Sequence, residues 1–159
     1  MDHINLDQDS LDQNVAAGEA ASVAPAADTS QIRVLLVEDE SLIAEIIGEA
    51  LTEHGYAVHA VPNAQDALEH LSAGSRIDLL FTDINLPGDI DGARLATLVR
   101  EMHPGLPVIY ASGRWALLDE LRGVPHSAIL QKPYSPARAC AAVEVLVVAK
   151  EPAREAALA

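Results

Sequence analysis

From Ile32 onward, the chain contains five short runs of apolar residues, each bounded by polar residues or by Gly and Pro. The runs are rich in Val, Ile and Leu and too short for helices, which is typical of strands buried on both faces. We therefore predict five β-strands, over residues 32–37, 56–61, 77–82, 106–111 and 127–131.

Between these runs, apolar residues recur at the three- and four-residue spacing of an amphipathic helix. Ser41 is placed to cap the first helix and Gly55 to end it, and Asn63 is placed to cap the second. Ser135 opens the last helix, with Pro136 in its first turn. The helices are predicted around residues 42–51, 67–71, 95–102, 115–121 and 136–149. Five strand-then-helix units predict an α/β fold, a five-stranded parallel sheet with helices on both faces.

Residues 1–31 differ from the rest of the chain in composition. They carry six acidic side chains and no Lys or Arg, and their second half is low in complexity. Such a segment buries too little apolar surface to offset its conformational entropy, so we predict a disordered acidic tail. The predicted organisation is this tail, a folded domain over residues 32–149 and a short extension over residues 150–159.

Charge and cysteine content exclude several classes of protein. The formal net charge of −14 argues against direct binding to nucleic acid, because phosphates would be repelled. No apolar run reaches about 18 residues, so no membrane span is predicted. The single Cys140 excludes an intrachain disulfide and fits a reducing, cytoplasmic compartment. We expect Cys140 in the core and the scattered histidines at structural or surface positions.

Polar residues follow four of the five predicted strands. Glu38 and Asp39 follow the first strand and Asp83 the third. Ser112 follows the fourth strand and Lys132 the fifth. In open parallel α/β sheets, ligands bind outside the carboxyl ends of the strands, so the fold brings these side chains to one edge. Each alone is more often a cap or a turn residue, but together they indicate a functional site.

The chemistry of these five side chains is coherent. Clustered carboxylates repel one another, and Mg²⁺ relieves that repulsion because it prefers oxygen ligands and takes one or two carboxylates together with phosphate oxygens. Asp39 and Asp83 are the expected direct ligands, with Glu38 acting partly through water. Asp83 could then attack a phosphoryl group, while Lys132 and Ser112 neutralise and hydrogen-bond its oxygens. The resulting acyl phosphate would act as a switch.

These segments resemble the receiver domain of two-component response regulators, the CheY-like superfamily. The resemblance rests on "VLLVEDE", "LLFTDINLPG", "VIYASG" and "LQKPY", which occur in the family's order and spacing across nearly the whole predicted domain. It implies a flavodoxin-like (βα)5 receiver, phosphorylation of Asp83 and a cis bond before Pro133. It also implies Mg²⁺, or Mn²⁺ in its place, bound by Asp39, Asp83 and the backbone carbonyl of Asn85, with Glu38 in support.

The resemblance also implies the protein's partners. The phosphoryl group would come from a sensor histidine kinase or a histidine phosphotransfer protein, and the chain would be no enzyme beyond its own phosphorylation and dephosphorylation. Because only "KEPAREAALA" follows the last predicted helix, we expect a single-domain regulator that acts by changing its contacts with other proteins. That helix is apolar on more than one face, which fits either a homodimer contact or simple core burial.

The predicted switch departs from the family pattern. Ile129 stands three residues before the lysine, where many receivers have an aromatic residue that swings inward on phosphorylation. Tyr110 lies nearby and is the candidate substitute. Tyr134 falls where the family commonly has a packed Phe, so we expect it in the core.

The surroundings of the acceptor also differ from the usual pattern. The "LPGDIDG" loop is one residue longer than is common, which changes the surface beside the phosphorylation site. Arg114 and Asn85 occupy two positions that tune dephosphorylation in this family by guiding the attacking water. Arg114 could pair with the phosphoryl group or with a partner, and it fits a solvated surface residue equally well.

Two other classes of function stay open. A haloacid-dehalogenase-type phosphatase would need a second acid two residues after its nucleophile, where this chain has Asn85. A receiver-shaped docking protein that works without phosphorylation would have no need for three clustered carboxylates, although Ile129 is consistent with it. The sequence identifies neither the kinase nor the downstream target.

Overall fold

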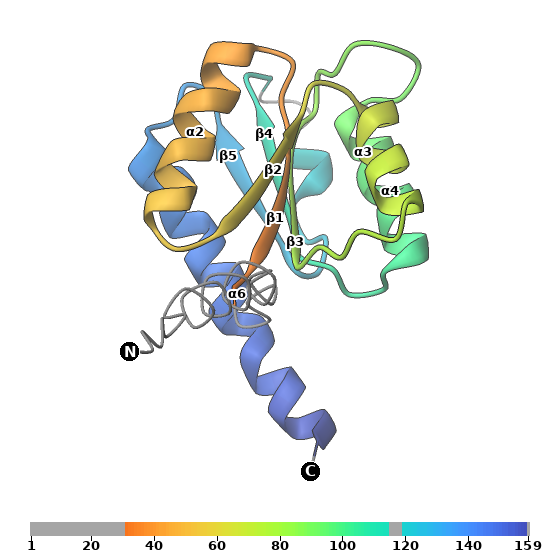
Figure 1. The fold of residues 1–159 in the computed structure, drawn as a ribbon, viewed down its shortest axis with the longest axis vertical. Helices are drawn as coiled ribbons and strands as arrows, with labels where there is room; N and C mark the ends of the chain where they lie inside the picture. The colour runs from red at the N-terminus through yellow and green to blue at the C-terminus, as the bar shows by residue number, and fades with distance from the viewer. Residues whose placement is uncertain (1–30, 115–118, 159) are drawn as a thin grey trace, which may run out of the picture. The chain divides into compact units, whose positions relative to one another are not determined.

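The computed structural model describes residues 31–114 and 119–158, with only the helix itself described for residues 151–158. The strands form one parallel sheet in the order β2-β1-β3-β4-β5 (Figure 1). Their bounds are β1 (Arg33–Val37), β2 (Ala57–Val61), β3 (Leu79–Asp83), β4 (Val108–Ser112) and β5 (Ser127–Gln131). This is the strand order of flavodoxin-like folds, so the predicted fold class is confirmed.

Helices cover both faces of the sheet (Figure 1). The helices are α2 (Ser41–Glu53) and α6 (Pro136–Leu158) on one face, and α3 (Ala64–Ser72) and α4 (Gly92–Met102) on the other. Successive strand residues point to opposite faces, and each face has its own core. Leu80 belongs to the core that α3 and α4 cover, whereas Phe81 belongs to the core that α2 and α6 cover. Cys140, which the sequence predicts to lie in the core, is buried in the core that α2 and α6 cover.

Three predicted helix signals are confirmed. The Asn63 side chain accepts the N–H of Asp66 at 2.7 Å and caps α3. Gly55 follows the C-cap of α2 with φ of 93°, in the left-handed region that favours a residue without Cβ. Ser135 Oγ accepts the N–H of Arg138 at 3.2 Å, just before the proline that begins α6.

The predicted Ser41 cap is wrong. α2 begins at Ser41 itself, and Glu40 occupies the cap position without a side-chain cap bond. The turn before α2 is stabilised by a residue that precedes it, because Glu38 Oε1 accepts the N–H of Glu40 at 3.1 Å. Glu38, one of the residues predicted at the functional site, therefore contacts the residue that caps α2.

The last helix is longer than the sequence predicts. α6 continues to Leu158, through residues that the sequence assigns to an extension beyond that helix. Pro152 costs one helical hydrogen bond, but the Ala, Arg, Glu and Leu residues that follow it are strong helix formers. Within the described ranges no helix, α6 included, has the length and apolar character that crossing a membrane requires.

Two predictions lie outside the described residues in whole or in part. The disordered tail falls on residues 1–31, of which only Gln31 is described. The helix predicted over Trp115–Leu121 is described only at residues 119–121, which are helical.

Candidate functional site

Parallel pairing brings the ends of β1 and β3 side by side. Val37 at the end of β1 is in register with Thr82 of β3, so the residues that follow each of them are neighbours. Those residues are Glu38 and Asp83, both buried, at 4% and 5% exposure. Asp39 comes next in the chain and is exposed. The edge of the sheet therefore presents two sheltered carboxylates and one open to solvent.

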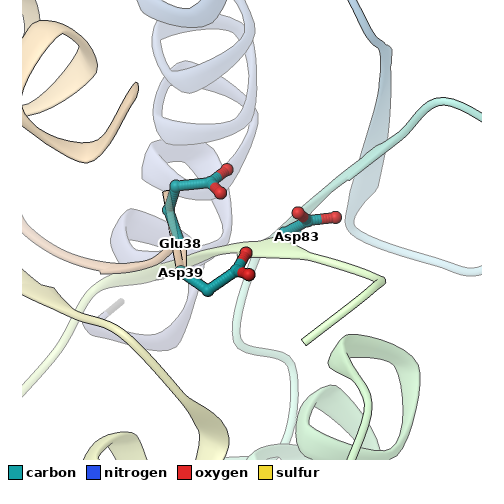
Figure 2. A group of neighbouring side chains, drawn as sticks. All are labelled: Glu38, Asp39 and Asp83. Carbon is teal, nitrogen blue, oxygen red and sulfur yellow. The ribbon is translucent and has the colours of Figure 1, made fainter. Parts of the chain in front are cut away.

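The three carboxylates form one cluster. Oxygen atoms of Glu38, Asp39 and Asp83 lie within 4.8 Å of one another, and Figure 2 shows Asp39 directed to the space between the other two. Oxygen donors at this separation match the preference of Mg²⁺ for hard, anionic ligands. The donor set therefore fits a hard divalent cation. The backbone carbonyl of Asn85 stays a predicted fourth ligand.

Lys132 joins the cluster from the segment after β5. Its Nζ lies 2.8 Å from Asp83 Oδ2 and 3.2 Å from Glu38 Oε2. Burial alone would lower the pKa of Lys132, but the hydrogen bond and charge of Asp83, followed by those of Glu38, outweigh it and raise the pKa. The ammonium therefore stays charged at neutral pH. The Lys132–Pro133 peptide bond is cis, as the sequence predicts.

Burial disfavours the charged form of the Glu38 carboxyl, which its position in the sequence does not indicate. Burial raises the pKa of its carboxyl, although the N–H of Glu40 and the charge of Lys132 act in the opposite direction. A carboxylate in this setting is disfavoured in its charged form unless positive charge lies close. Added positive charge close to Glu38 would therefore favour its charged form.

Ser112 ends β4 and is fully buried. Its Oγ accepts the backbone N–H of Arg114 at 3.1 Å, and its carbonyl accepts the N–H of Lys132 at 2.9 Å. With its oxygen engaged as an acceptor, the hydroxyl hydrogen of Ser112 is available for donation. The β4 end is thus tied directly to the segment that carries the lysine.

The loop after β3 provides a further contact to Asp83 and lines a cavity beside the three carboxylates. Asn85 donates its backbone N–H to Asp83 Oδ1 at 3.0 Å, so each carboxylate oxygen of Asp83 has a defined partner. A cavity of about 620 Å³ opens beside the cluster, and its lining includes Asp39, Asn85 and Arg114. The two residues predicted to tune dephosphorylation therefore share a cavity with one of the acids.

The predicted switch residues lie side by side in the sheet. Tyr110 of β4 is in register with Ile129 of β5 on one side and with Thr82 of β3 on the other. Tyr110 is 4% exposed and belongs to the core that α3 and α4 cover. Tyr134 is half-buried and packs against the core on the opposite face, with its ring centroid 6.1 Å from that of Phe81, so its predicted place in the core is confirmed in part.

Sequence reasoning missed one residue that positions the site. Gly92, the first residue of α4, lies so close to β3 that a Cβ there would approach the Asp83 backbone oxygen to 1.9 Å. Asp91 caps the helix by accepting the N–H of Arg94 at 2.7 Å. The Asp91-Gly92 pair before a helical pattern could have predicted the helix cap from the sequence. The close approach of Gly92 to the Asp83 backbone depends on tertiary packing.

A second missed feature joins two histidines. His59 of β2 and His70 of α3 stack with ring centroids 3.9 Å apart and an interplanar angle of 10°. Burial, and then the charge of His59, lowers the pKa of His70. The predicted structural or surface role of these histidines is consistent with the stack, but no spacing in the sequence pairs them.

Comparison with known proteins agrees with this geometry. The sequence profile of the response regulator receiver domain matches residues 34–144, more than half of the chain. The crystal structure of a response regulator receiver protein from Sinorhizobium medicae WSM419 is similar, with 36% sequence identity and a TM-score of 0.70. The similarity covers 76% of this chain and 98% of that one.

Curated relatives include regulators and a kinase. The transcriptional regulatory protein CreB of Escherichia coli (strain K12) is 34% identical over 117 residues, 72% of this chain and 50% of CreB. The sensor kinase CckA of Brucella abortus (strain 2308) is 32% identical over 135 residues, 82% of this chain and 14% of CckA. This chain thus spans half or less of the length of these relatives. The profile match and the receiver structure together show that the chain belongs to the response regulator receiver domain family of two-component signalling.

Proposed function

We propose that this receiver works in a two-component phosphorelay, in which Asp83 accepts a phosphoryl group in a Mg²⁺-dependent reaction. The observation that carries the proposal is the position of Lys132, 2.8 Å from Asp83 Oδ2 and 3.2 Å from Glu38 Oε2. An aspartate that only caps a turn needs no ammonium and no further carboxylates beside it. Their combination supports a site for phosphoryl transfer.

In the proposed transfer, a carboxylate oxygen of Asp83 attacks the phosphorus of a phosphohistidine on the donor protein. The P–O bond to Asp83 forms as the P–N bond breaks, and the leaving imidazole keeps the electron pair and takes up a proton. Asp39, Asp83 and the Asn85 carbonyl, with Glu38 in support, would hold Mg²⁺, which would supply positive charge to the phosphoryl oxygens. The product is an aspartyl phosphate, which carries about two negative charges.

Lys132 and Ser112 hold the new phosphoryl group. The Lys132 ammonium moves its hydrogen bond from Asp83 to a phosphoryl oxygen, where it neutralises charge. The Ser112 hydroxyl donates to another oxygen, because its own oxygen already accepts the Arg114 N–H. In the cavity beside Asp39, Arg114 pairs with the phosphoryl group and Asn85 guides the water that later hydrolyses it.

Tyr110 takes the role of the aromatic residue that Ile129 replaces. Ser112 and Tyr110 lie two residues apart on β4, so their side chains point to the same face of the sheet. When the Ser112 hydroxyl moves to donate a hydrogen bond to the phosphoryl group, it therefore displaces β4, the strand that carries Tyr110. The register contact between Tyr110 and Ile129 extends this movement to β5.

The phosphodonor is a sensor histidine kinase or a histidine phosphotransfer protein. A groove of about 500 Å³ between α2 and the segment after β5 supports this assignment. Lys132 lines the groove together with apolar residues, namely Ile43, Ile46, Ile47, Pro133, Tyr134 and Pro136. Because Lys132 also belongs to the phosphorylation site, a protein seated in this groove lies beside Asp83.

Intact-mass measurement after incubation with Mg²⁺ and acetyl phosphate, and separately with phosphoramidate and a phosphorylated histidine kinase, tests the proposal. We expect the wild-type chain to gain one phosphoryl group only when Mg²⁺ is present. Asp83→Asn is expected to gain none. Asp89→Asn, an exposed acid in the same loop, is the matched control and is expected to be labelled like the wild type.

Two results would overturn the proposal. One is labelling of Asp83→Asn at the wild-type rate, which would place the acceptor elsewhere. The other is a wild-type chain that no donor labels. The second result would favour the docking protein that works without phosphorylation.

A further inference from the structure

β2 forms one edge of the sheet, and among the described residues only β1 pairs with it (Figure 1). The Ala57 N–H and the Val61 carbonyl are bonded on the β1 side, to backbone groups 2.8 Å and 3.1 Å away. Because backbone groups alternate in direction along a strand, those of Val58 and Ala60 point away from the sheet. The edge therefore presents N–H and C=O groups that a further strand can bind.

An open groove of about 600 Å³ lies between this edge and α2. Val58 and Ala60 line it from β2, so it adjoins the residues whose backbone groups point outward. On the helix side, Gly48 leaves room in the groove, because a Cβ there would lie 4.0 Å from Val58 Cγ1 and meet nothing closer. The proposed phosphodonor groove also lies on α2, but the two grooves have no lining residue in common.

The helix side of this groove is acidic. Glu45, Glu49 and Glu53 line it, all three are exposed, and α2 contains no Lys or Arg. None of the three forms an ion pair within the described part of the chain. A second copy joined edge to edge at β2 would bring its own row of glutamates beside this one and be repelled. The charge therefore favours a basic partner over another copy of this chain.

The spacing of the glutamates specifies the partner further. Residues four apart on a helix are separated by about 6 Å along its axis. Every second residue of an extended strand lies about 7 Å from the one before, on the same face. Since α2 packs along β2, a strand added to this edge sets three alternate side chains opposite Glu45, Glu49 and Glu53.

We propose that the β2 edge and the acidic side of α2 together bind an extended segment of a partner protein, with Lys or Arg at alternate positions. The segment pairs with the outward backbone groups of Val58 and Ala60 and directs its basic side chains to the glutamates. No residue of the phosphorylation site lines this groove. Binding therefore needs no phosphoryl group on Asp83.

Fluorescence anisotropy of the unphosphorylated full chain with a labelled, end-capped heptapeptide of alternating lysine and valine tests the proposal. We expect saturable binding by the wild type. The variant Glu45→Gln/Glu49→Gln/Glu53→Gln is expected to bind about tenfold more weakly, because three exposed charge pairs are lost. Circular dichroism is expected to show this variant folded, since all three side chains are exposed.

The matched control removes the same charge elsewhere. Glu69→Gln/Glu101→Gln/Glu144→Gln changes exposed acids on three other helices and is expected to bind nearly as the wild type does. A second control concerns the backbone: a peptide of the same sequence, N-methylated at alternate residues, keeps its charges but cannot pair as a strand. We expect it to bind at least tenfold more weakly than the unmethylated peptide.

Amide hydrogen exchange locates the bound peptide. The N–H groups of Val58 and Ala60 are expected to exchange more slowly when the unmethylated peptide is bound. Ala60→Pro removes one of these outward N–H groups without touching a bond to β1, and it should weaken binding. The proposal is overturned by a wild type that does not bind the peptide, by equal weakening in the two glutamine variants, or by a methylated peptide that binds as well as the unmethylated one.

Discussion

Single residues set the electrostatic balance of the site, which holds three carboxylates against one ammonium. Glu38 and Asp83 share the Lys132 ammonium, and Asp39 adds a third negative charge within 4.8 Å. Burial is the main cause of the raised pKa of Glu38, and the charge of Asp83 acts in the same direction. Without a bound cation, the repulsion among these groups opposes folding.

The first prediction removes one of the three charges. Asp39→Asn is expected to stabilise the Mg²⁺-free protein by about 1 kcal/mol, which raises its melting temperature by about 3 °C. The same variant should lose most of the stabilisation that Mg²⁺ gives the wild type. Thermal melts in EDTA and in millimolar MgCl₂ measure both effects. Asp89→Asn, outside the cluster, should leave the Mg²⁺ effect unchanged, and a lower melting temperature for Asp39→Asn in EDTA would refute the repulsion.

At the scale of elements, the packing of α4 on β3 positions the acceptor. Gly92 begins α4 against the Asp83 backbone, and its N–H donates to the Ile84 carbonyl at 2.9 Å. The Asp91 cap then orients the first turn of the helix. The position of Asp83 is thus set by the N-terminus of α4 as well as by β3.

Gly92→Ala is expected to destabilise the fold by about 3 kcal/mol, because the new methyl group forces α4 away from β3. The midpoint of urea unfolding measures the loss. Gly113→Ala is the control at the end of β4, where a Cβ meets no atom within 4 Å, and it should cost little. Equal stability of the two variants would contradict the close approach.

At the scale of the whole molecule, the net charge is strongly negative and the described residues form few ion pairs that could offset the repulsion. The net charge is −14, and two of the four ion pairs in the described part of the chain are made by Lys132. Residues 1–31 carry six of the negative charges, and the rest of the chain has a net charge of −8 with few ion pairs to offset it.

Salt should therefore stabilise the protein. Raising NaCl from about 0.01 M to about 1 M shortens the Debye length from about 30 Å to about 3 Å, which screens this repulsion. We expect the melting temperature in EDTA to rise, for the wild type and for Asp39→Asn alike. A flat or falling melting temperature would mean that the few attractive pairs dominate.

The sequence by itself determined the architecture and the candidate residues. Short apolar runs and helical spacing report burial locally, so the strands and most helices could be read one segment at a time. Parallel strands end at one edge, which is why Glu38, Asp83 and Lys132 could be expected together from their positions after strands. The Asn63 cap and the end of α2 at Gly55 were readable because their physics involves only neighbouring residues.

Only the tertiary structure decided how distant segments meet. The double contact of Lys132, the stack of His59 on His70 and the approach of Gly92 to β3 each join residues far apart in the chain. The Ser41 cap was wrong because Glu40 occupies the cap position, where its N–H is bound by the Glu38 side chain. The apolar pattern of α6 was equally compatible with burial and exposure, because a helix pattern does not say how many of its faces other elements cover. Packing on the sheet and on α2 uses one face, and that leaves Val145 and Val148 exposed.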